Sequence, residues 1–328
     1  MSKKTVLGAL MHASGNILTI LAGLLSFPAF TRLLSTADYG LMSLLSTTTY
    51  LCIGFCKCGM QQALLRHWSS DAKANHVAFS TALFGVLAMA CANTSIVLLL
   101  ISAYLNTTHG ETPLLLALVG GTIVFESLKS ILLNKELALG HSGRYNIAKV
   151  VNKYITVLLA IALLMTLQRG ADDVFRGMYA GAAIVFAWLY VSDAQFKAKP
   201  ANFDLGVFKK MLRFGFPLLI AELIDQALAF SDRYFIAYFL GVTAVGHYAS
   251  AYNFIFNVQS VMISSFSLTI APAVVQKYRA EQDPGVQDFL EKSLKIYCAI
   301  GSAVALGLFS VGADTFILIN FCPRGIVI

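Results

Sequence analysis

The sequence predicts an all-α membrane protein with many spans, and two observations support this prediction. Of the 328 residues, 57% are apolar and 12% are charged, whereas soluble domains average roughly 45–50% and about 25%. Apolar stretches longer than about 18 residues, enough for a transmembrane helix, recur along the whole chain. A soluble globular enzyme, a disordered chain and a coiled coil are therefore excluded. An outer-membrane barrel is excluded too, since its strands would alternate with period two, whereas residues 96–101 and 157–165 are continuously apolar.

Nine membrane-spanning helices are expected, and short polar breaks separate most of them. The longest breaks fall at 193–213 and 275–291. The expected helices cover residues 7–29, 40–62, 77–104, 113–134, 146–167, 174–192, 214–240, 245–274 and 292–320.

Positive charge is distributed unevenly between the two sides of these spans. With the N-terminus in the cytoplasm, 17 of the 24 Lys and Arg residues fall in inner segments and four in outer segments. The other three, Lys57, Lys129 and Arg233, lie inside spans. Because cytoplasmic loops are enriched in Lys and Arg, the count predicts a cytoplasmic N-terminus. The net charge of +7 has the same origin and does not indicate binding to nucleic acid.

An amphipathic segment divides the chain. Residues 203–213 (FDLGVFKKMLR) are expected to lie along the inner membrane surface as a connector. We therefore predict a first six-helix bundle at 1–200, a cytoplasmic connector at 201–213 and a second, incomplete bundle of three helices at 214–328.

The two predicted halves share a repeat with an offset of 206 residues. Residues 33–43 and 239–249 each end one span and open the next, and they align Gly40 with Gly246. The helix that follows each of them carries a polar stripe within about an 80° arc at 100° per residue. The stripes are Ser43, Thr47, Tyr50, Gly54, Lys57 and Gln61 in the first half, and Asn253, Asn257, Ser260, Ser264 and Ser267 in the second.

Two similar halves in the same orientation are typical of transporters that bind substrate between the halves. Two complete units would need about 412 residues, more than the 328 present. We therefore expect a truncated or frameshifted product that lacks about three helices, and an inactive product is one alternative for its function.

Several motifs resemble those of a known family. Residues 27–40 (FPAFTRLLSTADYG) are similar to the first-helix signature of Wzx-type polysaccharide biosynthesis flippases. Residues 214–217 (FGFP), 231–236 (SDRYFI), 239–241 (FLG) and 244–246 (AVG) resemble that family's seventh-helix region. The resemblance extends to about residue 320 and places the chain in the multidrug/oligosaccharidyl-lipid/polysaccharide (MOP) exporter superfamily.

The resemblance implies a two-bundle fold of the MOP and MATE kind around a central lumen. It also implies flipping of undecaprenyl-diphosphate-linked oligosaccharide across the bacterial inner membrane, for O-antigen or capsule synthesis. Partners would be this lipid-linked oligosaccharide, membrane lipids and other polysaccharide-assembly proteins. A multidrug antiporter of the same superfamily is the first alternative, and a membrane polysaccharide polymerase is a second, although no large outer loop supports it.

Charged residues within the spans are the first candidates for function. A charge at membrane depth costs at least roughly 2.5–3.5 kcal/mol on insertion scales, so it normally faces a lumen or a partner. Four charged residues fall within about a 100° arc of the predicted helix 214–240. We hypothesise that a carboxylate among Glu222, Asp225 and Asp232 binds a coupling proton or sodium ion, and that Arg233 contacts the lipid diphosphate. The alternative is an internal ion pair that only stabilises the bundle.

Other basic and polar side chains are candidates for the substrate lumen. Lys57 could meet a phosphate or extend to the interface. Arg66, Lys149 and Lys153 could form a cationic vestibule or simply follow the positive-inside rule. Asn253 belongs to the second polar stripe. Glu126 and Lys129, three residues apart, are expected to form a structural pair.

No enzyme site is visible in the sequence. It lacks a GxxxxGK[ST] phosphate loop, an HExxH motif and a GxSxG elbow. The six cysteines fall mostly in apolar runs, and Cys56 and Cys58 lack the spacing of a zinc pair. We therefore predict a transporter without catalytic residues, bound metal or cofactor, apart from coupling to H⁺ or Na⁺.

Overall fold

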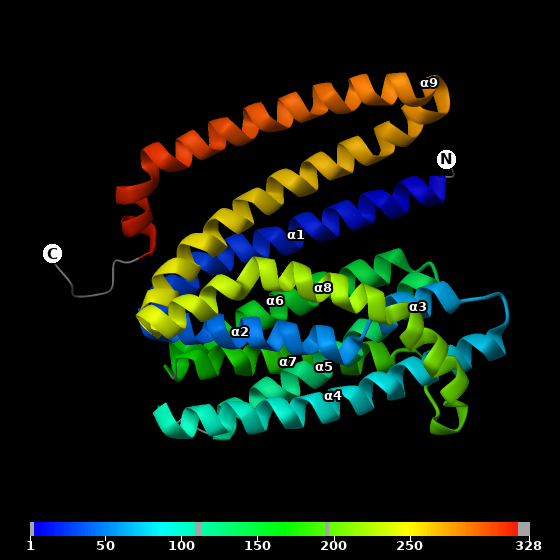
Figure 1. The fold of residues 1–328 in the computed structure, drawn as a ribbon, viewed down its shortest axis with the longest axis horizontal. Coiled ribbons are helices and arrows are strands. Elements are labelled where there is room, and N and C mark those ends of the chain that lie inside the picture. Colours follow the sequence, from blue (N-terminus) through cyan, green and yellow to red (C-terminus); the bar gives the residue numbers. More distant parts are fainter. Residues whose placement is uncertain (1–2, 109–112, 169, 194–196, 321–328) are drawn as a thin grey trace.

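The computed structural model describes residues 3–108, 113–168, 170–193 and 197–320, and within this part the chain is all α (Figure 1). Most helices run side by side along the long axis of the molecule. The elements are α1 (Lys3–Leu33), α2 (Thr36–Lys57), α3 (Met60–His67), α4 (Ala72–Thr108), α5 (Pro113–Ala138), α6 (Ser142–Thr166), α7 (Ala171–Val191), the 3-10 helix η1 (Pro200–Asn202), α8 (Leu205–Leu240) and α9 (Val242–Asn320).

Seven stretches within α1 to α8 are long and apolar enough to cross a membrane, which agrees with the first seven predicted helices. The predicted helix 40–62 differs in one respect, because it breaks between α2 and α3. Cys58 and Gly59 take left-handed conformations there, with φ of 45° and 67°. A Cβ at Gly59 would lie 2.3 Å from the carbonyl oxygen of Gly215 in α8, so this break lets α8 approach the end of α2 closely.

Most of the region predicted as a connector, residues 205–213, forms the start of α8. The helix begins at Leu205, where Asp204 caps it by accepting a hydrogen bond from the amide of Val207 at 2.9 Å. In Figure 1 its first turns lie across the right-hand end of the bundle, and the remainder runs along the bundle. Pro217 lies inside the helix, where proline permits such a change of direction.

Helix α9 covers both of the last two predicted spans. The backbone of the expected break at 275–291 is helical, but the chain reverses direction within α9, so the last two predicted spans form two separate arms (Figure 1). The first arm packs against α1 and α2. The side chains of Ser264 and Ser267, predicted for the second polar stripe, lie outside the described part.

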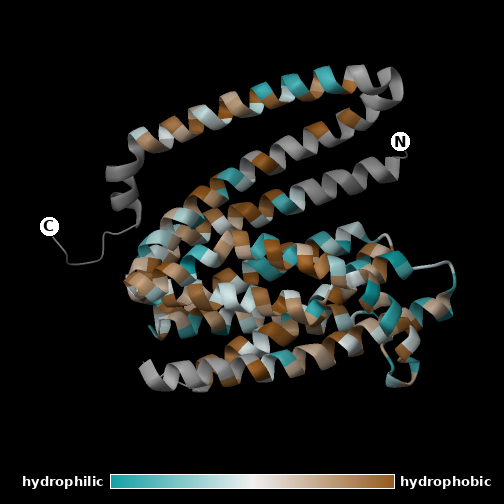
Figure 2. Cartoon of the chain, viewed as in Figure 1, coloured by the Kyte–Doolittle hydropathy of each residue, from teal (hydrophilic) through white to brown (hydrophobic). Residues whose placement is uncertain are grey.

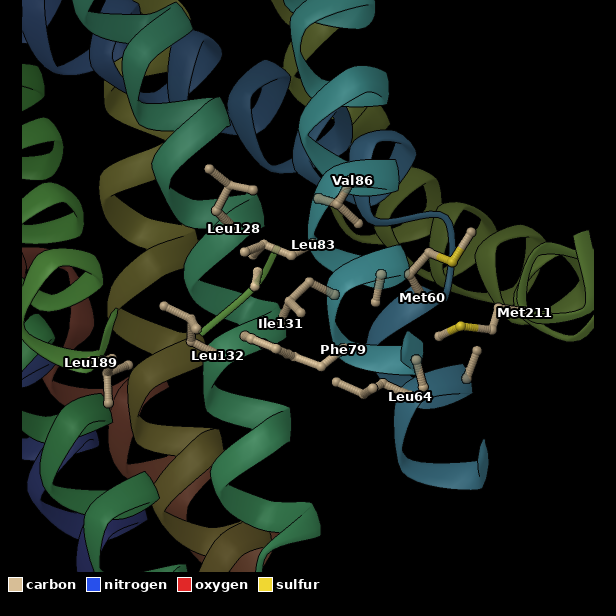
Figure 3. Close-up of a cluster of buried hydrophobic side chains, with 14 of the residues drawn as sticks. Met60, Leu64, Phe79, Leu83, Val86, Leu128, Ile131, Leu132, Leu189 and Met211 are labelled. Carbon is tan, nitrogen blue, oxygen red and sulfur yellow. The ribbon is translucent and has the colours of Figure 1, made fainter. Parts of the chain in front are cut away.

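Hydrophobic residues dominate the length of the helices, and many hydrophilic residues lie at the right-hand end of the bundle in Figure 2. The largest buried apolar cluster joins α8 to the first bundle (Figure 3). Met211, at the start of α8, is fully buried near Met60 and Leu64 of α3. This packing fixes where α8 begins and therefore how it passes α2.

A buried group of charges ties the ends of α5, α6 and α7 together. Lys135 has no exposed side-chain surface and pairs with Asp193, and its Nζ lies 3.4 Å from Oε1 of the equally buried Glu136. Glu136 also faces His141 at 3.2 Å and Arg144 at 3.8 Å. Removing one member of such a buried group leaves its partners uncompensated.

We therefore predict that Lys135→Ala lowers the free energy of unfolding by about 3–5 kcal/mol, because the buried carboxylates of Asp193 and Glu136 would both lose this cation. Thermal unfolding of the detergent-solubilised chain, followed by tryptophan fluorescence, measures the change. Lys292→Ala is the matched control, since Lys292 forms an exposed pair with Asp288 and should change stability by less than about 1 kcal/mol. Equal losses in the two variants would contradict the prediction.

Candidate functional site

A cavity of about 420 Å³ lies between the first bundle and helices α8 and α9. Helices α1, α2, α5, α6 and α7 line one part, and α8 and α9 line the rest. Its walls combine aromatic, amide, hydroxyl and charged side chains. The principal polar and aromatic lining residues are Ser26, Phe27, Phe30, Tyr39, Ser43, Ser46, Thr47, Tyr50, Glu126, Asn152, Lys153, Thr156, Phe230, Arg233, Tyr252, Asn253, Phe256 and Asn257.

The charges of this cavity do not cancel one another. Glu126 lines it, but its carboxylate already accepts a hydrogen bond from Lys129 at 2.5 Å. Among the side chains that the structure describes, no carboxylate lies within 4 Å of the charged nitrogens of Lys153 or Arg233. Neither Lys153 nor Arg233 therefore forms a direct ion pair among the described residues, although Glu126 lines the same cavity and Asp232 adjoins Arg233.

Arg233 is 4% exposed and bridges three helices. Its Nη1 donates to Ser43 Oγ at 2.9 Å and to Thr47 Oγ1 at 3.3 Å, both on α2. Its Nη2 donates to Asn253 Oδ1 on α9 at 3.0 Å, and the amide of Asn253 donates in turn to Tyr39 OH at 3.1 Å. The buried Nε of Arg233 has no hydrogen-bond partner among the described residues. The guanidinium is thus held by neutral acceptors and keeps one N–H unused.

Beside the cavity, α2 and α9 cross at two glycines; we call this contact the glycine crossing. A Cβ at Gly40 would lie 2.1 Å from the carbonyl oxygen of Val242, and a Cβ at Gly246 would lie 2.0 Å from that of Thr36. Only glycine allows backbones to come so close. Gly40 and Gly246 are the residues that the internal repeat aligned.

Three predicted lumen residues, Lys153, Arg233 and Asn253, line the cavity together. Lys57, Arg66 and Lys149 do not line it. Lys57 Nζ instead donates to Glu222 Oε1 at 2.8 Å, which joins α2 to α8. The guanidinium of Arg66 lies 4.5 Å from the ring centre of Phe214, and Lys149 Nζ donates to Asn16 Oδ1 at 3.0 Å.

The three predicted coupling carboxylates are separated in the structure. Glu222 pairs with Lys57, and Asp225 lies on the exposed surface of α8. Asp232 accepts hydrogen bonds from the hydroxyl of Tyr248 and, at 2.8 Å, from the backbone N–H of Arg233. Of the three, only Asp232 adjoins the hydrogen bonds around Arg233.

Sequence reasoning missed some of the lining. Glu126 was expected only as the partner of Lys129, and that pair is present, but Glu126 also faces the cavity. Asn152, Tyr39 and Tyr252 were not singled out. For Asn152 a signal existed, since Asn152, Lys153 and Thr156 form a short polar patch in an otherwise apolar helix.

The fold is that of MOP-superfamily transporters. An inward-facing multidrug resistance MATE family transporter is 16% identical, with a TM-score of 0.67, over 95% of this chain and 76% of that one. A MATE structure in complex with MaL6 is 15% identical, with a TM-score of 0.62, over 98% and 75%. A MOP superfamily transporter from Pyrococcus furiosus is 15% identical, with a TM-score of 0.60, over 96% and 74%. At such identities the likeness shows the fold alone.

The family described as polysaccharide biosynthesis protein matches residues 6–277. The chain belongs to this family and is a multi-pass membrane transporter. No curated protein matches it. The predicted fold class and family resemblance are therefore confirmed.

The ion pair between α2 and α8 gives a prediction for stability. Lys57→Gln and Glu222→Gln should each lower the unfolding temperature, because each leaves a mostly buried charge without its partner; the side chains are 15% and 25% exposed. The double variant should lose less than the sum of the two, with a coupling energy of about 0.5–3 kcal/mol. Strictly additive losses in thermal unfolding would show that the pair does not join the helices in solution.

Proposed function

We propose that this transporter flips an undecaprenyl-diphosphate-linked oligosaccharide across the bacterial inner membrane, for O-antigen or capsule synthesis. The observation that carries the proposal is the pair of cations, Lys153 and Arg233, which line one cavity and form no direct ion pair with a described carboxylate. Such a cavity favours an anionic group, and a guanidinium can hold a phosphate through two parallel hydrogen bonds.

The remaining lining suits the sugars. Asn152, Asn253 and Asn257 offer amide donors and acceptors that match hydroxyl groups. Aromatic rings such as those of Tyr39 and Tyr252 offer flat apolar surfaces for the C–H faces of a sugar ring. The polyprenyl tail needs no site, since it remains in the hydrocarbon of the bilayer. A volume of about 420 Å³ falls within the range of small-ligand sites, roughly 300–1,000 Å³.

The expected orientation places the N-terminus in the cytoplasm, where the substrate is assembled. In that orientation the glycine crossing lies on the outer side, and the start of α8 lies on the inner side. Other polysaccharide-assembly proteins are the expected partners at the membrane.

Multidrug antiport is the second candidate function, because Glu126 and the aromatic rings of the cavity could receive an organic cation. Lys129 already neutralises Glu126, so we place this candidate below the flippase.

The flippase proposal predicts a loss of transport on removal of either cation. In proteoliposomes with a fluorescent polyprenyl-diphosphate oligosaccharide, Lys153→Gln and Arg233→Gln should each slow flipping at least about tenfold, as loss of one charge-assisted contact predicts. Lys292→Gln, an exposed position outside the cavity, should flip at the wild-type rate. Vesicles that take up ethidium but never move the lipid-linked oligosaccharide would overturn the proposal in favour of the antiporter.

We further propose that Asp232 is the carboxylate that binds a coupling proton or sodium ion, because it alone of the three candidates adjoins Arg233. A pH gradient or a sodium gradient, imposed separately, should accelerate flipping by the wild-type protein. Asp232→Asn should retain the rate without a gradient and lose the acceleration, whereas Asp225→Asn should keep both. An unchanged gradient response in Asp232→Asn would exclude Asp232 as the ion site.

A further inference from the structure

The glycine crossing is reciprocal, which is the first observation behind a further inference. Gly40 approaches the carbonyl of Val242, and Gly246 approaches the carbonyl of Thr36. With the repeat offset of 206, Gly40 corresponds to Gly246 and Thr36 corresponds to Val242, so the two contacts are equivalent. The two halves of the repeat therefore meet here about a local two-fold axis, as the two sides of an isologous contact do.

Arg233 bridges the same two helices further along. Its acceptors Thr47 and Asn253 are also related by the offset of 206, and each lies seven residues beyond its crossing glycine. Seven residues correspond to about two helical turns, or about 10 Å. One guanidinium on α8 thus holds α2 and α9 together at equivalent positions of the two halves.

The hydrogen bonds that hold this bridge are replaceable. Ser43, Thr47 and Asn253 are neutral acceptors, and the Nε of Arg233 has no partner among the described residues. A phosphate brings a negative charge and can accept two parallel N–H bonds from one guanidinium, which neutral hydroxyl and amide acceptors on separate helices cannot do. A phosphate-type anion that enters the cavity therefore competes favourably for the guanidinium, and it can also use the free N–H.

We propose that Arg233 is an anion-operated latch of the glycine crossing. Without an anion, its bonds to α2 and α9 keep the crossing closed; when a phosphate group takes the guanidinium, the bridge is lost and the two helices can separate. The hydrogen bond between Asn253 and Tyr39 remains as a weaker link between α9 and α2. The inference rests on the proposed function in one respect, namely that the substrate carries a phosphate group. It does not depend on the sugars of the substrate.

Amide hydrogen exchange of the full chain in lipid nanodiscs tests the latch, with inorganic pyrophosphate as the probe. We expect pyrophosphate to accelerate exchange at residues 36–47 and 242–253 at least threefold in the wild-type protein. Exchange in α4, none of whose residues lines the cavity, should not change. Arg233→Gln should show fast exchange at the crossing from the start and no response to pyrophosphate.

Two further variants separate the latch from general damage. Thr47→Val removes one acceptor and keeps the cation, so basal exchange at the crossing should rise while the response to pyrophosphate persists. Ser231→Ala, an exposed position on α8 two residues from Arg233, should behave as the wild type. If Arg233→Gln misfolds, the Thr47→Val result alone decides.

Slow basal exchange at the crossing in Thr47→Val, or no response to pyrophosphate in the wild type, overturns the latch. The proposed function fails separately. Flipping without an exchange response means that the flippase assignment stands and the latch is wrong. An exchange response in a protein that does not flip the lipid-linked oligosaccharide means that the latch stands and the flippase assignment is wrong.

Discussion

The cost of placing a charge in hydrocarbon governs the whole arrangement. A charged side chain at membrane depth must find a partner, a lumen or the interface, since hydrocarbon offers no water. Where charged side chains only hold helices together, they form ion pairs. There are three such ion pairs: Lys57 with Glu222, Lys129 with Glu126, and Lys135 with Asp193. Lys153 and Arg233 differ from these residues, because each faces the cavity and forms no direct ion pair with a described carboxylate. The same rule that explains the pairs thus identifies the site.

Much of the fold could be predicted because hydropathy is a local property. The first seven spans follow from the length of the apolar stretches, and the repeat anticipated that Gly40 and Gly246 are equivalent. The break at Cys58 and Gly59 could not be found in this way, since it accommodates the close approach of Gly215, more than 150 residues away in sequence. The sequence analysis also did not predict that the backbone of residues 275–291 is helical. A polar composition indicates exposure to water, but it does not show that a helix ends.

The site was predictable only in part. Helical periodicity correctly placed Glu222, Asp225 and Asp232 on neighbouring angles of one helix, but an angle does not say what lies opposite. In the structure the neighbours of α8 differ along its length, so Glu222 meets Lys57 and Asp232 meets Tyr248. The polar stripes predicted the positions of Thr47 and Asn253 better. These two residues are equivalent in the repeat, and in the structure both accept hydrogen bonds from Arg233 near the glycine crossing.

The repeat also shows where the two halves differ. In the same register the counterpart of Arg233 is Phe27, which is 5% exposed, lines the cavity and packs against Phe254 with ring centres 5.6 Å apart. A strictly symmetric cavity would carry two arginines, and a phosphate bound between them would hold both halves equally. With phenylalanine in one place and arginine in the other, only the half that contains α8 carries a charge at this repeat position. The hydrogen bonds of Arg233 to α2 and the ring contact of Phe27 with Phe254 both cross between the halves, so movement between the halves changes both, but only at Arg233 does it change the surroundings of a charge.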